Sequence, residues 1–331
     1  MVTSPYAVVA GRLATGLADI TADVSALDSP GFWVLVQTFE GRAVCARFDD
    51  VRPYRGYHGP PWSGPPRDAW TSSLDGPAYR RGVQRIREAI AAGEVYQVNL
   101  CRVLTAACPG PVGLTALHGA LRRGNPAPYA MVVDVPGAQV VSASPELFLR
   151  RCGRTVTSSP IKGTGRTAAD LSPKDTAENV MIVDLVRNDL SRVAETGSVD
   201  VPALCAVESH PGLVHLVSTV TARLRPGVGW AALLEATTPA GSISGAPKST
   251  ALRLVGELEP TPRSVYCGAL GWVDGAAQTG ELAVAIRTFS WSDGVLALGT
   301  GAGITWGSDP DAEWAETELK ASRLLEVAAG C

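Results

Sequence analysis

The chain has 331 residues, of which 46% are hydrophobic and 18% are charged, and its formal net charge is -3. This balance is typical of an ordinary globular protein and provides no bulk positive charge for nucleic acid or anionic lipid. The first residues lack a basic segment before an apolar stretch, and no window approaches the roughly 18 apolar residues that span a bilayer. We therefore expect a cytoplasmic protein that binds neither nucleic acid nor membrane.

The first third of the chain contains strands, a long irregular segment and a helix. The apolar run at 32–39 is followed by Glu-Gly, a pattern typical of a strand and a turn. Residues 52–77 are so rich in proline and glycine that we expect a surface loop there. Apolar residues then recur at three- and four-residue spacing through 78–93, which predicts a helix that ends at Gly93.

Strand patterns dominate the rest of the chain. The helix that breaks this pattern begins at Ser172, where Ser at the N-cap, Pro173 and Asp175 form a start signal. A second helix is expected at 248–260, and a last one from Ser308. The expected strands lie at 95–106, 131–135, 138–144, 146–159, 264–273, 281–289 and 294–306.

The seven cysteines are odd in number, and none of them forms a C-x-x-C pair. Most of them lie inside the apolar runs that read as strands. We therefore expect reduced, buried thiols rather than a disulfide framework or a metal site.

Two of the expected helices carry paired carboxylates with a spacing of three residues. Asp175 with Glu178, and Glu313 with Glu316, each lie on one helix face, and Lys320 extends the second pair. Taken alone, each pair is most often a solvated surface. If the two helices converge, the four carboxylates form a hard-oxygen site suited to Mg²⁺.

Several single residues have both an ordinary and a functional interpretation. Lys162 follows a strand and precedes a glycine, and alone it reads as an exposed lysine in a turn. Arg287 lies at the end of an apolar run, where it can be an ordinary cation at a strand end or a residue that binds an anionic ligand. His215 reads as a core histidine, and Glu146 as a turn carboxylate.

Two glycine-rich segments resemble nucleotide-binding loops only superficially. In 241–250, Pro247 precedes the lysine and offers no backbone N–H, whereas a phosphate loop has glycine there. The segment 299–303 lacks the third glycine of the dinucleotide fingerprint. Neither segment predicts nucleotide binding.

Ten motifs occur together in a characteristic order. They are VYQVNL, SPELFLR, PIKGT, ENVMIVDLVRNDLSRV, VHLVSTV, GSISGAPK, YCGALGW, AIRT, GAGI and SDPDAEWAETELKA. This order resembles the chorismate-utilising enzymes of the anthranilate synthase component I family, and most of all the aminodeoxychorismate synthases. The resemblance covers roughly residues 77–328. It implies an α/β (α+β) fold, a sandwich of large antiparallel sheets with helices outside and the active site between.

The resemblance also implies a metal and a set of site residues. Glu178 and Glu316 match the main Mg²⁺ ligands, and Asp175 and Glu313 match carboxylates that contribute directly or through water. Glu146 and His215 match residues beside the C4 hydroxyl of chorismate, where a carboxyl with a raised pKa can act as an acid. The residues matching substrate contacts are Gly163, Thr164, Ser242, Tyr266, Arg287, Gly301, Gly303 and Lys320.

Two positions indicate the type of reaction. Isochorismate and salicylate synthases carry a lysine base where this chain has Gln97, and glutamine cannot take a proton from water. Anthranilate synthases usually have a small residue where this chain has Lys162. The resemblance thus implies that Lys162 adds to C2 of chorismate and that ammonia then enters at C4, giving 4-amino-4-deoxychorismate for p-aminobenzoate and folate-type biosynthesis.

The resemblance sets the expected domains and partner. Residues 1–76 form a shortened N-terminal segment that contributes strands, and 77–331 form the chorismate-binding catalytic domain. No cysteine lies in a nucleophile-elbow setting, so ammonia is expected from a separate glutamine amidotransferase subunit. Two alternatives stay open: an anthranilate synthase component I, and a catalytically weak scaffold that binds an amidotransferase.

Overall fold

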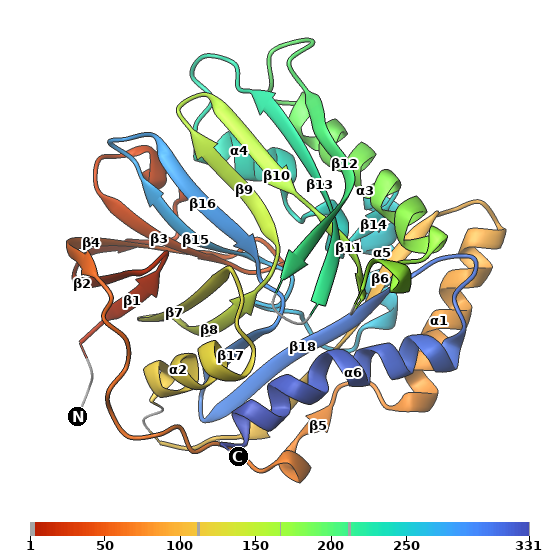
Figure 1. Ribbon diagram of the computed structural model, residues 1–331, viewed down its shortest axis with the longest axis horizontal. Helices are drawn as coiled ribbons and strands as arrows, with labels where there is room; N and C mark the ends of the chain where they lie inside the picture. Colours follow the sequence, from red (N-terminus) through yellow and green to blue (C-terminus); the bar gives the residue numbers. More distant parts are fainter. Residues whose placement is uncertain (1–3, 111–112, 166, 211–212, 331) are drawn as a thin grey trace.

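A computed structural model describes residues 4–110, 113–165, 167–210 and 213–330, in which antiparallel strands are flanked by helices (Figure 1). The strands begin with β1 (Tyr6–Val9), β2 (Arg12–Thr21), β3 (Phe32–Gln37), β4 (Ala43–Pro53), β5 (Thr71–Ser72), β6 (Gln97–Ala107), β7 (Tyr129–Val135), β8 (Ala138–Ser144) and β9 (Leu147–Cys152). They continue with β10 (Thr155–Ser159), β11 (Ile161–Gly165), β12 (Asp200–His210), β13 (Leu213–Arg223), β14 (Gly245–Ala246), β15 (Ala269–Asp274), β16 (Thr279–Val284), β17 (Thr288–Ser292) and β18 (Val295–Ile304).

The helices lie between these strands in the sequence. The α-helices are α1 (Gly76–Ala91), α2 (Leu114–Gly124), α3 (Pro173–Ser191), α4 (Trp230–Thr237), α5 (Lys248–Leu258) and α6 (Pro310–Ala328). The 3-10 helices are η1 (Val24–Asp28), η2 (Arg67–Ala69), η3 (Ala168–Asp170) and η4 (Gly241–Ile243).

The strands pair into one continuous antiparallel ribbon. From one end, the order is β6, β18, β17, β8, β7, β1, β2, β4, β3, β15, β16, β9, β10 and β13. At the far end β11 and β12 also pair with β13, and at the near end β5 and β14 pair with β6. The first strands of the chain thus join the middle of the ribbon, between segments that come later in the sequence.

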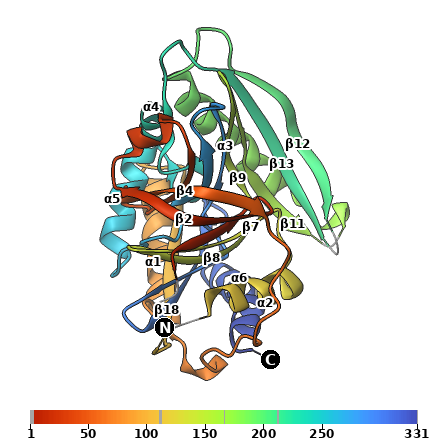
Figure 2. The same cartoon turned by 90° about the vertical axis from the view of Figure 1, so that its left-hand side faces the viewer.

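Helices cover both ends of this ribbon. At one end, α6 packs along β18 and contacts α1 and α2 (Figure 1). At the other end, α3 packs on β13, β11 and β12, and it also contacts α4 and η4. Figure 2 shows β12 and β13 standing as a long hairpin beside α3. The two carboxylate-bearing helices, α3 and α6, therefore come from opposite ends of the ribbon.

Local sequence signals account for two of the helices. Asp75 accepts a hydrogen bond from Ala78 N at the start of α1, and Gly93, at φ 75°, follows its end, so the helix predicted at 78–93 is confirmed. Ser172 caps α3 as predicted. Its hydroxyl accepts from Asp175 N, and the Asp175 side chain accepts from Ser172 N, which forms a capping box.

The structure differs from the sequence prediction in two strands. Residues 281–289 were expected to be one strand, but the chain breaks between β16 and β17, and Arg287 takes φ 50° there. The strand expected from residue 264 begins only at Ala269, because 264–267 form a turn. In both cases, an apolar run continues through a bend set by tertiary packing.

Six cysteines lie in the described part of the chain, and none of them forms a disulfide there. Four are buried as expected, whereas Cys152 is exposed and Cys205 is partly exposed. Among the described helices, none is both long and apolar enough to cross a membrane.

Candidate active site

Lys162 lies on β11, at an irregularity in its pairing with β13. Lys162 is opposite Leu216, and the register shifts before Thr164, which is opposite His215. Gly163, at φ 78°, occupies the shift, and a Cβ there would lie 2.9 Å from Asp175 Cβ at the start of α3. A glycine is needed for both reasons: the positive φ, and the close approach of strand and helix. Of Thr164, a predicted substrate contact, the structure describes only the backbone.

The side chain of Lys162 is partly buried. Its Nζ donates a hydrogen bond to the backbone carbonyl of Ser242, at 3.1 Å. Burial lowers the pKa of Lys162, although the carboxylates of Glu178, Glu146 and Glu316 act in the opposite direction. The ammonium of Lys320 also lowers it. Side chains predicted to share one site, from segments far apart in the sequence, thus act electrostatically on one amine.

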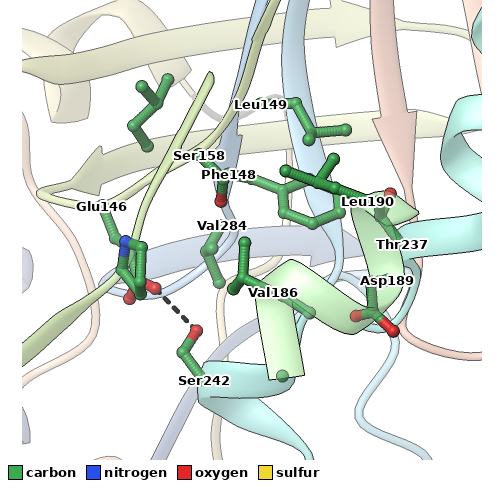
Figure 3. A pocket seen from close by; sticks show the side chains of 14 residues that line it. Glu146, Phe148, Leu149, Ser158, Val186, Asp189, Leu190, Thr237, Ser242 and Val284 are labelled. Atoms are coloured by element: carbon green, nitrogen blue, oxygen red, sulfur yellow. Dashed lines mark hydrogen bonds between the residues drawn. The ribbon is translucent and has the colours of Figure 1, made fainter. Parts of the chain in front are cut away.

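Glu146 follows β8 and is 4% exposed. Its Oε1 accepts a hydrogen bond from the Ser242 hydroxyl at 2.6 Å (Figure 3). Burial raises the pKa of Glu146 to about 7, even though the Ser242 hydrogen bond and the charge of Lys162 favour the ionised form. A carboxyl with this pKa is partly protonated at neutral pH, so it can donate a proton.

A small cavity lies behind this carboxyl. Glu146 and Ser242 line one side, apolar side chains such as Phe148 and Val186 line its wall, and Asp189 lies on the other side (Figure 3). Its volume of about 10 Å³ has room for about one water-sized molecule. Asp189 is already paired, because Lys248 Nζ donates to its Oδ2 at 2.7 Å. A cavity of this volume is too small for a ring substrate.

His215 and Gln97 occupy buried positions near the same place. His215 lies on β13, opposite Thr164 of β11 and Glu208 of β12, and is buried. Gln97 opens β6 and is also buried, and its Oε1 has no hydrogen-bond partner among the described residues. A buried carbonyl oxygen without a donor is free to accept a hydrogen bond from a ligand.

Gly303 lies beside side chains from both ends of the ribbon. It lies on β18, where a Cβ would be 2.5 Å from Gln97 Nε2 and 3.7 Å from Glu178 Oε2. Strand β18 therefore touches both β6 and α3 at this point. The lack of a side chain at Gly303 leaves room for the Gln97 carboxamide, whereas the distance to Glu178 is an ordinary contact.

Glu178 and Glu313 converge on a lysine that sequence reasoning did not single out. Nζ of Lys174, in the first turn of α3, lies 3.7 Å from Glu178 Oε1 and donates to Glu313 Oε1 at 3.2 Å. Although partial burial lowers the pKa of Lys174, the charges of Glu313 and Glu178 raise it overall. The sequence did contain a signal for Lys174. A lysine in the first turn of a helix is disfavoured by the helix macrodipole, so its presence there suggests a nearby negative charge.

The other two predicted ligands have partners of their own. Asp175 caps α3 through Ser172, as described above. Glu316 is half-exposed and pairs with Lys320 at 2.6 Å, and Lys320 Nζ also donates to the carbonyl of Gly301 at 3.0 Å. Within the described residues, no three acidic, histidine or cysteine side chains are grouped as a metal site.

The donor set nevertheless fits a hard cation. Glu313 is 3% exposed, and its Oε1 accepts from the Ser308 hydroxyl at 2.5 Å. Its other oxygen, Oε2, is buried and has no hydrogen-bond partner in the described part of the chain. Glu178 and Glu313 already share a cation, and carboxylate oxygens are the ligands Mg²⁺ prefers. The residues present therefore suit Mg²⁺.

Arg287 and Tyr266 lie in different surroundings. The guanidinium of Arg287 makes no hydrogen bond or ion pair with a described residue, and burial lowers its pKa. An unpaired, partly desolvated guanidinium suits a carboxylate ligand. Tyr266 is buried against Gly299, which leaves no room for a side chain at that glycine. Tyr266 thus packs against β18 at Gly299, two residues before the predicted contact Gly301.

A family model described as chorismate binding enzyme matches residues 43–326. The match spans most of the chain, and the chain belongs to this family. The predicted relationship is thereby confirmed.

Two curated relatives are similar over about the same region. Aminodeoxychorismate synthase component 1 of Klebsiella aerogenes is 39% identical over 269 residues, 78% of this chain and 59% of that protein. Anthranilate synthase component 1 of Streptomyces coelicolor is 42% identical over 269 residues, 77% of this chain and 52% of that protein. The chain thus spans between half and three fifths of the length of these relatives.

The fold has a counterpart of known structure. The crystal structure of anthranilate synthase component I from Streptococcus pneumoniae has a TM-score of 0.77 and 25% identity, over 88% of this chain and 80% of that one. The predicted sandwich of antiparallel sheets with outer helices is confirmed by this likeness.

Proposed function

We propose that this chain aminates chorismate to 4-amino-4-deoxychorismate, with Lys162 as a covalent nucleophile. One observation carries the proposal: the Lys162 amine and Glu146, a carboxyl with a pKa of about 7, both form hydrogen bonds with Ser242. Burial lowers the pKa of the Lys162 amine, which favours the neutral, nucleophilic form. An amine whose neutral form is favoured and a carboxyl that can donate a proton near neutral pH are what an exchange at an allylic hydroxyl requires.

The first step joins Lys162 to the substrate. The neutral amine forms a bond to C2, the two ring double bonds shift, and the C4–O bond breaks. Glu146 gives its proton to the leaving hydroxyl, which departs as water, and the carboxylate takes the proton that the bound amine loses. This step conserves protons and leaves Glu146 protonated for the next turnover.

The second step exchanges the lysine for ammonia. Ammonia forms a bond to C4, the double bonds shift back, and the C2–N bond to Lys162 breaks. The released amine takes the proton that the bound ammonia loses. The sum is chorismate plus ammonia giving 4-amino-4-deoxychorismate and water, and two easier displacements replace one direct exchange.

Other residues have binding roles in this proposal. The unpaired guanidinium of Arg287 suits the enolpyruvyl carboxylate. The carboxamide of Gln97 can accept a hydrogen bond but cannot remove a proton from water, which disfavours hydroxylation. His215 borders the site on β13, beside the proposed position of the C4 hydroxyl.

The metal belongs to the same proposal. Glu178, Glu313, Glu316 and Asp175 would hold Mg²⁺ directly or through water, and Glu178 and Glu313 already pair with one cation, Lys174. When bound, Mg²⁺ would supply a positive charge for the ring carboxylate of chorismate.

Ammonia is proposed to come from a partner. The most similar relatives include a protein named aminodeoxychorismate synthase component 1, and the word component implies a second subunit. No cysteine of this chain reads as a glutaminase nucleophile. We therefore infer a glutamine amidotransferase subunit as the partner.

A second candidate is anthranilate synthesis, in which ammonia adds at C2 and pyruvate is eliminated. It is favoured by the 42% identity to an anthranilate synthase component 1, which slightly exceeds the identity to the aminodeoxychorismate synthase relative. Lys162 argues against it, because in this proposal its own amine takes the position from which ammonia would have to attack C2.

The deciding experiment identifies the product. The purified chain is incubated with chorismate, Mg²⁺ and an ammonium salt, and products are separated and weighed while pyruvate release is followed by a coupled assay. We expect 4-amino-4-deoxychorismate without pyruvate, and without ammonia an adduct on the peptide that contains Lys162. Lys162→Arg keeps a cation but not a nucleophile, so it should lose both. Anthranilate with stoichiometric pyruvate would establish the second candidate instead.

A further inference from the structure

Lys174 occupies the position between the two best-placed carboxylates of the site. Its ammonium nitrogen lies 3.2 Å from Glu313 Oε1 and 3.7 Å from Glu178 Oε1. Glu178 and Lys174 lie one turn apart on α3, whereas Glu313 comes from α6, 139 residues further along. The ammonium of Lys174 therefore forms ion pairs with acidic side chains of two different helices.

The position of Lys174 is unfavourable for a lysine on local grounds. It lies in the first turn of α3, where the helix macrodipole favours negative charge. The side chain gains little from burial, because 47% of its surface is exposed. What remains favourable is the pair of carboxylates, and one of them, Glu313, is almost fully buried. A buried carboxylate without a nearby cation would be strongly disfavoured.

Glu313 has capacity for a further cation. Its Oε1 already accepts from Ser308 and Lys174, while its buried Oε2 has no partner among the described residues. One ammonium therefore satisfies only half of this carboxylate. A divalent ion with two charges and several coordination positions could engage both oxygens.

We propose that Lys174 is a built-in counter-ion that holds the metal position in the metal-free protein and must leave it when Mg²⁺ binds. The inference rests on the proposed function only in assigning Mg²⁺ to Glu178 and Glu313. The half-exposed side chain can swing into solvent without disturbing the core, because its stem is not enclosed. Lys174 thus weakens Mg²⁺ binding by competition, and in exchange it stabilises the empty site.

This proposal predicts an effect of unusual sign. Lys174→Gln removes the competing charge, so it should tighten Mg²⁺ binding, lowering Kd by about tenfold, which corresponds to about 1.4 kcal/mol. The same change leaves Glu313 and Glu178 without a counter-ion, so the metal-free variant should melt at a lower temperature than the metal-free wild type. A residue that only positions the ligands would produce weaker binding instead.

The experiment measures melting temperature against Mg²⁺ concentration, at constant ionic strength and without substrate. Binding to the folded state raises the melting temperature, and the midpoint of this rise reports Kd. Arg187→Gln is the matched control, because it removes one positive charge from the same helix, where Arg187 pairs with Asp184 on the exposed surface. Thirteen residues from Lys174, about 20 Å along the helix, that charge is screened from the site.

The outcomes separate this inference from the proposed function. Tighter binding by Lys174→Gln, with Arg187→Gln equal to wild type, supports the counter-ion role. If the wild type binds Mg²⁺ and Lys174→Gln binds it equally or more weakly, the inference is wrong while the metal assignment stands. If no variant responds to Mg²⁺, both the metal assignment and the inference are wrong.

A second measurement uses only the wild-type chain, in case the variant does not fold. An amine-reactive reagent is applied with and without Mg²⁺, and modification of each lysine is quantified by peptide mass spectrometry. Mg²⁺ should increase the labelling of Lys174 severalfold by releasing it from the carboxylates. Lys248, paired with Asp189 away from the metal position, serves as the internal reference. Unchanged labelling of Lys174 at saturating Mg²⁺ would contradict the displacement.

Discussion

Replacing Glu146 with glutamine should remove a pH-dependent loss of stability from the protein. Folding raises the pKa of this carboxyl from 4.5 to about 7, because burial penalises the charged form. The folded protein therefore binds the proton more tightly than the unfolded chain does. The resulting stability is present at low pH and is lost as pH rises from 4.5 through about 7. Glutamine keeps the shape and can still accept from Ser242, but it has no proton to lose.

The size of the effect follows from these two values. The difference corresponds to about 3 kcal/mol in full, of which about 2 kcal/mol falls between about pH 5.5 and about pH 8. Urea unfolding of wild type and Glu146→Gln at both pH values measures it. The variant should gain about 2 kcal/mol relative to wild type at the higher pH.

An exposed carboxylate on α4 provides the control for a general charge effect. Glu235→Gln removes the same charge from the surface and should leave the pH dependence of the wild type unchanged. If Glu146→Gln and Glu235→Gln follow the same pH dependence, Glu146 is ionised in the folded protein throughout this range. The acid role proposed for Glu146 would then have no basis.

Three further predictions concern activity. At saturating Mg²⁺ and ammonium, kcat/KM for chorismate should fall as pH rises through about 7, because Glu146 loses its proton. A kcat/KM that still rises across this range would show that Glu146 is not the acid. Gly303→Ala places a methyl group 2.5 Å from Gln97 Nε2 and should cost about 1–3 kcal/mol in urea unfolding as well as activity, whereas Gly256→Ala, in open space on α5, should cost neither. The purified chain should use ammonium salts but not glutamine, and glutamine-dependent turnover by this chain alone would contradict the proposed partner.

Elements with local signals could be predicted from sequence, and those without them could not. The capping box of Ser172 and Asp175 predicts the start of α3, and the spaced apolar residues of 78–93 predict α1. The helix α2 was missed because Gly113 makes no side-chain cap bond, so its start has no sequence signal. Strand β12 was missed because Pro202 interrupts it and its register with β13 shifts twice.

The composition of the site was also only partly predictable from local sequence patterns. Residue spacing could place Asp175 with Glu178, and Glu313 with Glu316, each on one helix face. It could not show that α3 and α6 come together, as they do at Lys174 and Glu313, because these helices pack on strands at opposite ends of the ribbon. Only the resemblance to a family supplied that expectation.

Neither residue spacing nor the resemblance to a family predicted which charged side chains pair within the site. Lys174 lies between Glu178 and Glu313, whereas Asp175 is committed to its helix cap. These choices among neighbouring charges depend on distances of a few ångströms, which a sequence pattern does not contain.

The bend at Arg287 has a consequence for which substitutions the chain would tolerate. A non-glycine residue at φ 50° is strained, and an unpaired, partly buried guanidinium adds a desolvation cost. Both penalties disappear in Arg287→Gly, so a screen for thermal stability alone should enrich glycine at this position. Selection for growth that depends on the enzyme should instead restore arginine. Position 287 is thus one where stability and activity favour opposite residues.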